Sequence, residues 1–422
     1  MRRQVEGSRA VAETVARCRP DVVAAYPISP QTHIVEALSD LVSQGEVGRC
    51  QYLMVESEFG AMSACIGASA AGGRAYTATA SQGLLFMAEA LPNASGLRLP
   101  IVMTVANRAL GAPINIWNDH SDAMSQRDAG WVQLWAASNQ EAVDLHVQAF
   151  ALAERLSVPV MVCMDGFVLT HAMEEIDIPE QDQVDALVPP FRPTQVLDPD
   201  APITIGAMVG PEAFTEVKFL EAHRQLRAVD AVQDVADRFH EVVGRDSGGL
   251  TSSYRLEDAD VVVVALGSVL GTAADVVDEL RDEGVRAGTL GITCFRPWPT
   301  DEVRAALRGA SRVIVLNRAV SVGSGSILGQ DIRLALAGEH ARVHDVVVGL
   351  GGRPVTRHVL RRLVEDVVAG GVSEDALTFP DLDIALVARE LARESGTDPA
   401  ALLEGAALGR LETPRSTEEA AR

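Results

Sequence analysis

The chain has 422 residues, enough for two or three domains that each have a core of their own. Hydrophobic residues make up 47%, charged residues 22% and aromatic residues 4%, a composition typical of a soluble α/β protein. The formal net charge of -22 argues against nucleic acid as a partner, because an acidic surface repels phosphate backbones.

The N-terminal stretch MRRQVEGSRAVAETVARC has no apolar segment of the kind found in signal peptides, so we expect an ordinary amphipathic helix there. No segment comes near the roughly 18 uninterrupted apolar residues that a membrane helix needs. We therefore expect a cytoplasmic protein. The five cysteines are dispersed and form no Cys-x-x-Cys pair, which predicts neither a disulfide framework nor an iron–sulfur cluster held by this chain alone.

Up to about residue 180, short apolar strands alternate with helical stretches. The predicted strands are 21–28, 52–57, 74–81, 100–107 and 159–167. The predicted helices are 31–42, 57–72, 82–95 and 139–156. Apolar strands separated by helices predict a doubly wound parallel sheet covered on both faces.

From 181 to 255 the pattern weakens, and we expect an extended arm followed by a polar helix over 213–244. A second, smaller α/β domain is predicted over 256–370. Its predicted strands are 259–268, 286–299, 311–318 and 344–352, with helices over 271–284 and 300–310. Residues 371–422 read as a polar helical tail that ends in a frayed segment, ETPRSTEEAAR.

The segment AYPISPQTHIVEAL places Ser29 between Pro27 and Pro30, where a predicted strand passes into a predicted helix. Ser29 suits the N-cap position, with Pro30 as the first helical residue. The carboxyl end of a parallel strand also suits anion binding, because free backbone N–H groups point outward there. The residues alone favour the capped helix and leave a ligand site open.

The segment MVESEFGAMSACIGASAAGG places Glu56 and Glu58 at the end of a strand, ahead of a helix with small residues at three- and four-residue spacing. Such spacing lets two backbones approach closely, so we expect this helix to be deeply buried. Glu58 either caps the turn or presents an acid in a dry pocket. The residues alone favour the cap.

Three further features have simple structural interpretations. Asn118, Asp119, His120 and Asp122 are too close in sequence to converge on one ion, so we expect a loop at the edge of a pocket and assign no metal site. A lone histidine such as His33 is expected to be a packing or surface residue. The stretch AVSVGSGSILGQ resembles a dinucleotide fingerprint, but its glycine spacing is one residue too long, which favours a tightly packed turn.

Five motifs in order, YPISP, VESEFGA, ATASQGLLFM, NRALGAPINIWNDHSD and MDGF, resemble the alpha chain of the 2-oxoacid:ferredoxin oxidoreductases, in particular the pyruvate type. The resemblance continues more loosely through ALGSVLGTAADVVDELRDEG and FRPWP, and it does not extend over about the last fifty residues. It implies a thiamine-diphosphate-binding pyrimidine module followed by a transketolase C-terminal-like α/β domain.

The resemblance also implies roles for individual residues. Glu58 corresponds to the glutamate that faces the aminopyrimidine ring of thiamine diphosphate, with Glu56 as the competing choice. Ser29 stands where the family has a threonine that holds the substrate carboxylate, and Arg108 corresponds to the arginine that binds the same group. Without the resemblance, Arg108 would be read as a salt-bridged surface residue.

The chain lacks the Gly-Asp-Gly motif that presents Mg²⁺ to a diphosphate, since MDGF has no first glycine. We therefore expect one subunit of a complex, with a beta subunit carrying Mg²⁺ and the diphosphate and with iron–sulfur clusters in partner chains. The implied reaction is oxidative decarboxylation of pyruvate or a related 2-oxoacid with coenzyme A, giving acyl-CoA, CO₂ and reduced ferredoxin. The alternatives are an E1 beta-like subunit of a lipoate-dependent dehydrogenase and a non-catalytic nucleotide-binding or electron-transfer accessory chain.

Overall fold

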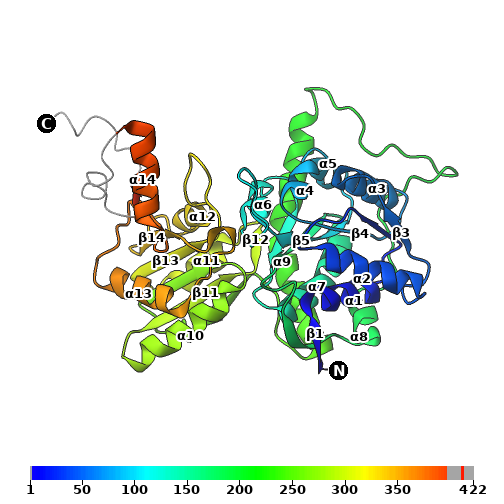
Figure 1. The fold of residues 1–422 in the computed structure, drawn as a ribbon. Coiled ribbons are helices and arrows are strands. Elements are labelled where there is room, and N and C mark those ends of the chain that lie inside the picture. Colours follow the sequence, from blue (N-terminus) through cyan, green and yellow to red (C-terminus); the bar gives the residue numbers. More distant parts are fainter. Residues whose placement is uncertain (1, 397–409, 413–422) are drawn as a thin grey trace. The chain divides into compact units, whose positions relative to one another are not determined.

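The computed structural model describes residues 2–396 and 410–412 (Figure 1). Contacts within the chain separate two compact units. The first comprises the residues up to Ser252 together with Leu266–Ser268 and Gly291–Glu302, and the second comprises the rest. Both units contain a sheet and helices, which confirms the predicted α/β class.

The first unit is built on a sheet of seven strands. In spatial order they are β12 (Cys294–Arg296), β6 (Val132–Trp135), β7 (Val160–Asp165), β5 (Val102–Asn107), β4 (Ala75–Thr79), β2 (Val22–Ala25) and β3 (Gln51–Met54). All pairings from β6 to β3 are parallel, and only β12 is antiparallel to its neighbour. Every residue of β4, β5 and β7 is buried, as strands covered on both faces require.

Nine helices accompany the first sheet in the described part of the chain. They are α1 (Gly7–Arg17), α2 (Thr32–Ser43), α3 (Glu58–Ala70), α4 (Ser81–Phe86), α5 (Ala90–Gly96), α6 (Ser121–Ser125), α7 (Asn139–Leu156), α8 (Gln181–Leu187) and α9 (Phe214–Val243). The predicted helix over 82–95 is divided into α4 and α5. Pro92 explains the division, because it has no N–H to donate and is tolerated only in the first turn, where the structure places it.

The N-terminal residues form a strand before they form a helix. β1 (Arg2–Glu6) pairs antiparallel with β8 (Met173–Asp177), and α1 begins only at Gly7. The prediction of a helix from the first residues is therefore wrong for β1. Its pairing partner lies about 170 residues away in the sequence, so local periodicity carries no trace of the strand.

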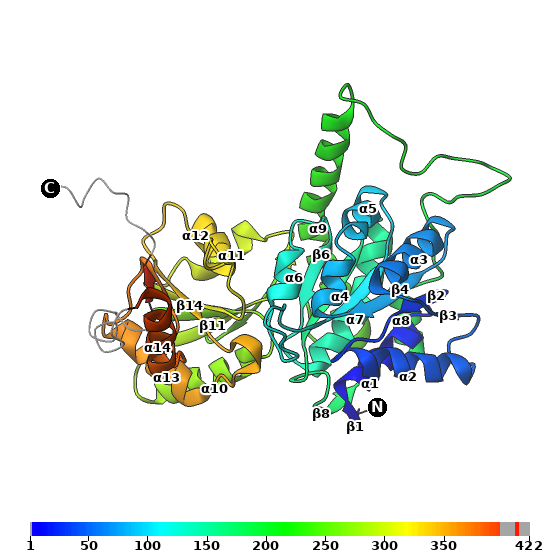
Figure 2. The ribbon, with the colours of Figure 1, turned by 45° about the horizontal axis from the view of Figure 1, so that its top comes forward.

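The segment predicted as an arm contains a short helix, α8, which begins with a capping box between Glu180 and Gln183. The predicted polar helix is α9. Its second half packs on the first unit through Ala228, Val232, Val235 and Phe239, which recur at helical spacing. The part before Ala228 contains no buried residue and stands away from the sheet (Figure 2).

The second unit is a separate α/β layer structure. Its sheet has the order β16 (Arg410–Glu412), β15 (Ala376–Thr378), β14 (Arg342–Val347), β13 (Arg312–Asn317), β10 (Val261–Ala265), β11 (Ala287–Ile292) and β9 (Thr251–Tyr254). Its helices are α10 (Val269–Asp282), α11 (Thr300–Leu307), α12 (Leu328–Ala335), α13 (Arg357–Val368) and α14 (Ile384–Ser395). Buried valines, leucines and isoleucines of β10, β13 and β14 form its core with α10 and α13.

Two predictions about the second half of the chain need correction. The single strand expected over 286–299 is two strands, because the chain leaves the second sheet after Ile292 and β12 pairs with β6. The tail is not wholly helical, since β15 pairs with β14 before α14 begins. Apart from Glu412, the segment expected to fray lies outside the described residues. Among the described helices, none combines the length and the apolar character that crossing a bilayer requires.

Candidate active site

Four neighbouring strands of the first sheet end beside residues of chemical interest. Ser29 follows β2, Glu58 follows β3, Ser81 follows β4 and Arg108 follows β5. Because parallel strands share one carboxyl edge, the sheet order brings these four loops to the same edge. Open α/β sheets bind their ligands outside this edge.

Glu58 is the first residue of α3 and is only 7% exposed. The helix cap is the preceding residue, Ser57, whose hydroxyl oxygen accepts a hydrogen bond from the Gly60 amide over 3.1 Å. The interpretation of Glu58 as the cap is therefore wrong. Within the described part of the chain, no group donates a hydrogen bond to the Glu58 carboxylate. Its competitor Glu56 is exposed to solvent.

Gly83 of α4 makes room for the Glu58 side chain. A Cβ atom at Gly83 would lie 2.6 Å from Glu58 Oε1 and 2.5 Å from Thr79 Oγ1, closer than real Cβ contacts. The Thr79 hydroxyl is buried and has no hydrogen-bond partner among the described residues. The sequence interpretation did not identify Gly83, although it follows directly on the strand within ATASQGLLFM.

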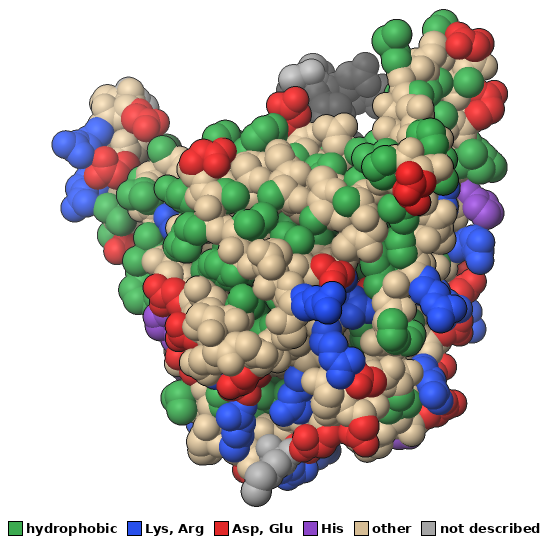
Figure 3. All heavy atoms as spheres, turned by 90° about the vertical axis from the view of Figure 1, so that its right-hand side faces the viewer, with side chains coloured by type: hydrophobic (Ala, Val, Ile, Leu, Met, Phe, Trp, Pro, Cys, Tyr) green, Lys and Arg blue, Asp and Glu red, His purple; other side chains and the backbone are tan. Residues whose placement is uncertain are grey.

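Of the small residues of α3 that we expected in the core, Ala61 is buried, and the others are not. Gly60, Ala64 and Ala68 are half-exposed, and Gly67 and Ala71 are exposed. The buried face is the one that carries Met62 and Cys65, because larger side chains remove more apolar area from water. Exposed apolar residues lie near the carboxyl ends of β3 and α4, Met54 at 61% and Phe86 at 57%. Figure 3 shows hydrophobic side chains gathered on this side of the first unit.

Arg108 is buried and contacts the loop that contains Ser29. Its Nη1 donates to the Ser29 carbonyl oxygen over 2.9 Å, and its Nε donates to the Asn115 carbonyl oxygen over 3.3 Å. Its Nη2 has no partner, and the guanidinium makes no ion pair, within the described residues. The surface salt-bridge interpretation is therefore wrong. Burial lowers the pKa of Arg108, and the nearby Asp122 opposes that shift.

Ser29 does not cap a helix. The helix α2 begins at Thr32 with Gln31 as its N-cap, so the predicted cap is also wrong. The Gln31 amide donates to Ile28 O over 2.9 Å in a turn, and its side-chain Nε2 bonds Tyr26 O and Ala78 O at 2.9 and 3.0 Å. The helix therefore has its N-cap at Gln31, two residues later than the predicted cap at Ser29. Ser29 is left exposed, with a hydroxyl that has no described partner.

Asp122 holds two of these loops together. Its Oδ2 accepts hydrogen bonds from the backbone amides of Ser81 and Arg108, each over 2.9 Å. Its Oδ1 accepts from Asn107 Nδ2 over 2.9 Å and from the Ala123 amide over 2.7 Å. Burial raises the pKa of Asp122, and these four hydrogen bonds oppose that shift. The clamp also supports Ser81 in a left-handed conformation, with φ of 50°.

The other polar residues of the same loop point to separate partners. Asp119 Oδ1 accepts from the Ser121 amide over 2.7 Å. His120 Nε2 lies 2.7 Å from Asp165 Oδ1, and the other oxygen of Asp165 accepts from the Ser268 amide over 2.9 Å. Asp165 is the aspartate of MDGF, so both of its oxygens are already in use. As expected from their adjacency, these side chains do not converge.

The five cysteines and the glycine-rich loop have structural roles. All five cysteines are free and buried, which confirms that they form no disulfide. Burial raises the pKa of the Cys65 thiol to about 12. In the glycine-rich loop, a Cβ at Gly329 would overlap the Asp345 carboxylate, and the Gly329 amide donates to Ser326 Oγ over 2.8 Å. The chain is tightly packed at Gly329, as the glycine spacing indicated, but Gly323 is exposed and a Cβ there would meet nothing within 4 Å, so the turn before α12 is open.

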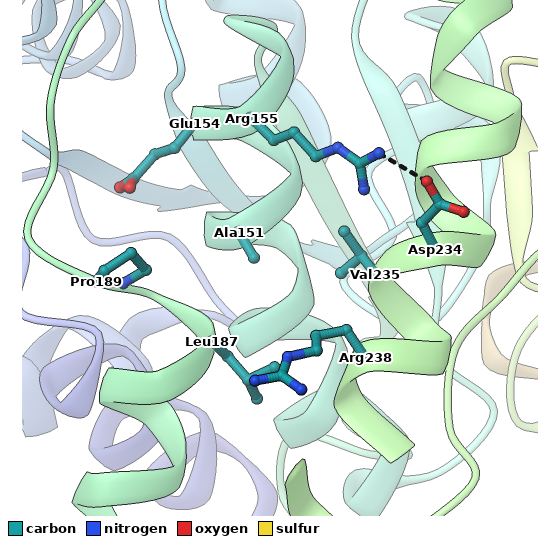
Figure 4. A pocket seen from close by; sticks show the side chains of 8 residues that line it. All are labelled: Ala151, Glu154, Arg155, Leu187, Pro189, Asp234, Val235 and Arg238. Atoms are coloured by element: carbon teal, nitrogen blue, oxygen red, sulfur yellow. Dashed lines mark hydrogen bonds and ion pairs between the residues drawn. The ribbon is translucent and has the colours of Figure 1, made fainter. Parts of the chain in front are cut away.

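A cavity of about 310 Å³ lies elsewhere in the first unit (Figure 4). It is lined by Ala151, Glu154, Arg155, Leu187, Pro189, Asp234, Val235 and Arg238. Arg155 and Asp234 form an ion pair over 2.6 Å across one side. None of the lining residues belongs to the loops at the carboxyl edge of the sheet, so this hollow is not part of the candidate site.

Comparisons with known proteins identify related families and relatives. Residues 13–237 match the family described as "Pyruvate flavodoxin/ferredoxin oxidoreductase, thiamine diP-bdg". Residues 259–360 match "Pyruvate:ferredoxin oxidoreductase core domain II". The first match contains all four loops at the sheet edge.

Several curated proteins are similar over nearly their whole length. Pyruvate synthase subunit PorA of Methanosarcina barkeri is 47% identical over 90% of this chain and 96% of its own. The PorA subunit of Thermotoga maritima is 44% identical over 88% and 95%. The ketoisovalerate oxidoreductase subunit VorA of Pyrococcus abyssi is 40% identical over 87% and 93%.

A solved structure shares the fold. It is 2-oxoglutarate:ferredoxin oxidoreductase from Magnetococcus marinus with 2-oxoglutarate, coenzyme A and succinyl-CoA bound, and it matches with a TM-score of 0.65 at 19% identity. The match covers 86% of this chain and 65% of the other, so this chain spans slightly less than two thirds of that protein.

Proposed function

We propose a role for this chain, which belongs to the pyruvate flavodoxin/ferredoxin oxidoreductase family. It is the subunit that holds the aminopyrimidine of thiamine diphosphate and the substrate carboxylate. The complex containing it carries out oxidative decarboxylation of a 2-oxoacid with coenzyme A. The products are acyl-CoA, CO₂ and reduced ferredoxin.

The proposal rests mainly on Glu58, a residue that is 7% exposed and whose carboxylate receives no hydrogen bond from the described residues. A largely buried glutamate whose carboxylate has no donor among the described residues is suited to a ligand that supplies one. An aminopyrimidine ring does so through a ring nitrogen that carries a proton. Thiamine diphosphate, when bound, would supply a nucleophilic carbon and an electron sink for the 2-oxoacid. Glu58 would hold or release the proton at a ring nitrogen of the bound aminopyrimidine.

The substrate carboxylate fits the loops after β2 and β5. Two nitrogens of Arg108, Nε and Nη1, hold the guanidinium in place through hydrogen bonds. Its Nη2 and the Ser29 hydroxyl have no partner among the described residues. The bond from Arg108 Nη1 to Ser29 O holds the two loops together, and a guanidinium and a hydroxyl can each donate to one carboxylate. We assign substrate orientation to this pair.

A beta subunit supplies what this chain lacks. Asp165 is bound to His120 and Ser268, so it is not free to coordinate Mg²⁺ at a diphosphate. All five cysteines are buried thiols, so we place the iron–sulfur clusters in partner chains that pass electrons to ferredoxin. The exposed small-residue face of α3, beside Phe86, is suited to close packing by the beta subunit.

We propose pyruvate as the 2-oxoacid. The loop NRALGAPINIWNDHSD, which contains Arg108, resembles the pyruvate type. Overall identity does not separate pyruvate from a branched substrate, because PorA of Pyrococcus furiosus and VorA of Pyrococcus abyssi are both 40% identical to this chain.

The test is to co-express the chain with its partner subunits and to follow reduction of a viologen dye that depends on coenzyme A. Pyruvate, 2-oxoisovalerate and 2-oxoglutarate are compared at equal concentration, with and without thiamine diphosphate. We expect pyruvate to give the highest kcat/KM and the isolated chain to be inactive. A higher value for 2-oxoisovalerate would overturn the substrate, and turnover without thiamine diphosphate would overturn the function.

A further inference from the structure

Three side chains that can bind metals meet on the surface of the first unit. They come from distant parts of the sequence: Glu6 ends β1, His33 lies in the first turn of α2, and His171 lies in the loop after β7. One ligand atom from each lies within 4.8 Å of the other two. Glu6 Oε1 is 2.7 Å from His33 Nδ1, and the two imidazole centroids are 4.6 Å apart. No other such group occurs among the described residues.

Backbone hydrogen bonds bring two of the three segments together. The Gly7 amide donates to Ala172 O over 3.0 Å, and the Ser8 amide donates to Thr170 O over 2.9 Å. These bonds lie directly beside Glu6 and on both sides of His171. The segments that carry the carboxylate and this imidazole are therefore fixed by the fold and do not depend on a bound ion.

The loop also orients the His171 ring. Thr170 Oγ1 accepts a hydrogen bond from the Phe167 amide over 2.8 Å and lies 2.7 Å from His171 Nδ1. The same oxygen can accept a second bond from a proton on Nδ1, and that tautomer leaves the lone pair on Nε2. Phe167 packs on the ring with centroids 4.7 Å apart. Metal-binding histidines are commonly oriented in this way through their other nitrogen.

We propose that Glu6, His33 and His171 bind a divalent ion of the zinc type, with water in the remaining position. Two imidazoles and one carboxylate are a familiar three-residue donor set for Zn²⁺, and imidazole favours late first-row ions over Mg²⁺ or Ca²⁺. Ligand atoms about 2.0–2.2 Å from a tetrahedral ion lie about 3.4 Å from one another. The side chains of Glu6 and His33, 29% and 48% exposed, have room to rotate and close the remaining distance.

Such an ion would join β1, the start of α2 and the loop after β7. The turn that contains Ser29 directly precedes α2, so the ion would also restrain the base of that turn. The site is independent of the proposed function, because it uses no residue of the candidate active site.

The experiment uses the full-length chain after dialysis against a chelator. Zn²⁺ is titrated by calorimetry, Co²⁺ by absorption spectroscopy, and thermal unfolding is followed with and without Zn²⁺. We expect one Zn²⁺ per chain, a Tm that rises with Zn²⁺, and a Co²⁺ spectrum without thiolate charge transfer. His33→Ala and His171→Ala should each weaken Zn²⁺ binding at least tenfold and remove the rise in Tm.

His240→Ala is the matched control. His240 Nδ1 lies 2.7 Å from Asp246 Oδ1, the same contact as between His33 and Glu6, but this pair has no third ligand among the described residues. The variant should bind Zn²⁺ as the unmodified chain does. The proposal is overturned if the chain does not bind Zn²⁺ at tenfold molar excess. It is equally overturned if His33→Ala and His171→Ala bind as tightly as His240→Ala, or if Co²⁺ shows thiolate ligands.

Discussion

Arg108 Nη1 donates a hydrogen bond to the carbonyl oxygen of Ser29 over 2.9 Å, joining residues that are 79 positions apart. The bond holds the loop after β2 against the loop after β5. It also uses the backbone of Ser29 rather than its hydroxyl. Two donors, the Ser29 hydroxyl and Arg108 Nη2, therefore both remain without a described partner and available for a ligand.

Arg108→Ala should lower kcat/KM for the 2-oxoacid by about 2–5 kcal/mol of transition-state stabilisation, because the substrate carboxylate loses its charged partner. Ser29→Ala should cost about 1–2 kcal/mol, since one neutral hydrogen bond is lost. Ser29→Thr, which keeps the hydroxyl, is the control and should be tolerated. Steady-state kinetics of the reconstituted complex measures all three. Unchanged kinetics in both alanine variants would contradict the assignment.

Glu58→Gln should leave the complex assembled and reduce kcat by a factor of about 10²–10⁴, the usual contribution of a group that transfers protons. Glutamine keeps the size of the side chain and removes its ability to take up the proton. Glu56→Gln is the matched control, because Glu56 is exposed and only two residues away. If the control loses activity and Glu58→Gln does not, the role belongs to Glu56.

Gly83→Ala tests the position of the Glu58 carboxylate without changing its chemistry. The added methyl would lie 2.6 Å from Glu58 Oε1, so the carboxylate must move. We expect kcat to fall at least tenfold while the secondary structure and the assembly stay unchanged. Gly96→Ala is the control, because a Cβ there meets nothing within 4 Å. Full activity of Gly83→Ala would show that the position of Glu58 is not critical.

Asp122→Asn should destabilise the first unit by about 2–4 kcal/mol, because an amide cannot accept from all four donors that face this carboxylate. Denaturant unfolding of the full chain measures the loss. Asp128→Asn is the control, since the side chain of Asp128 is 82% exposed, and its effect should be within about 0.5 kcal/mol. Equal stabilities of the two variants would refute the clamp.

His146 should make stability depend on pH. It is fully buried between Thr104 Oγ1 and Ala142 O, and burial lowers its pKa from 6.5 to about 4. The unfolded chain then binds more protons between these values, so stability falls as the pH drops through this range. From pH 7 to pH 5 the loss due to His146 is about 2 kcal/mol.

His146→Gln should remove that loss, measured as the difference between the two proteins at pH 7 and pH 5. The difference is needed because burial also raises the pKa of Glu141 to about 7, which makes stability fall as the pH rises and masks the effect in the unmodified chain. His223→Gln, at an exposed position, should behave as the unmodified chain does. An identical pH dependence in His146→Gln and the unmodified chain would contradict the prediction.

Local sequence patterns determined those helices and strands whose periodicity and end signals all lie within their own segment. The helix α7 spans Asn139–Leu156, the same range that was predicted, because Ser138 caps its start and a left-handed Ser157 ends it. The apolar runs of β5 and β7 likewise identify buried parallel strands. From these elements, the positions of Glu58 and Arg108 at strand ends could be predicted, and ordered motifs indicated the family.

Only the tertiary structure decided which strand ends are neighbours and which side chains meet there. The sheet order β5-β4-β2-β3 is not the chain order, and it brings Arg108 to Ser29. Gln31 bonds to Ala78 just before α2 begins, and Asp122 of α6 clamps the loops after β4 and β5. Each of these features rests on a hydrogen bond to a group distant in sequence. Periodicity and capping report on one segment of the chain and on which of its residues are buried. They contain no information about hydrogen-bond partners that are distant in the sequence.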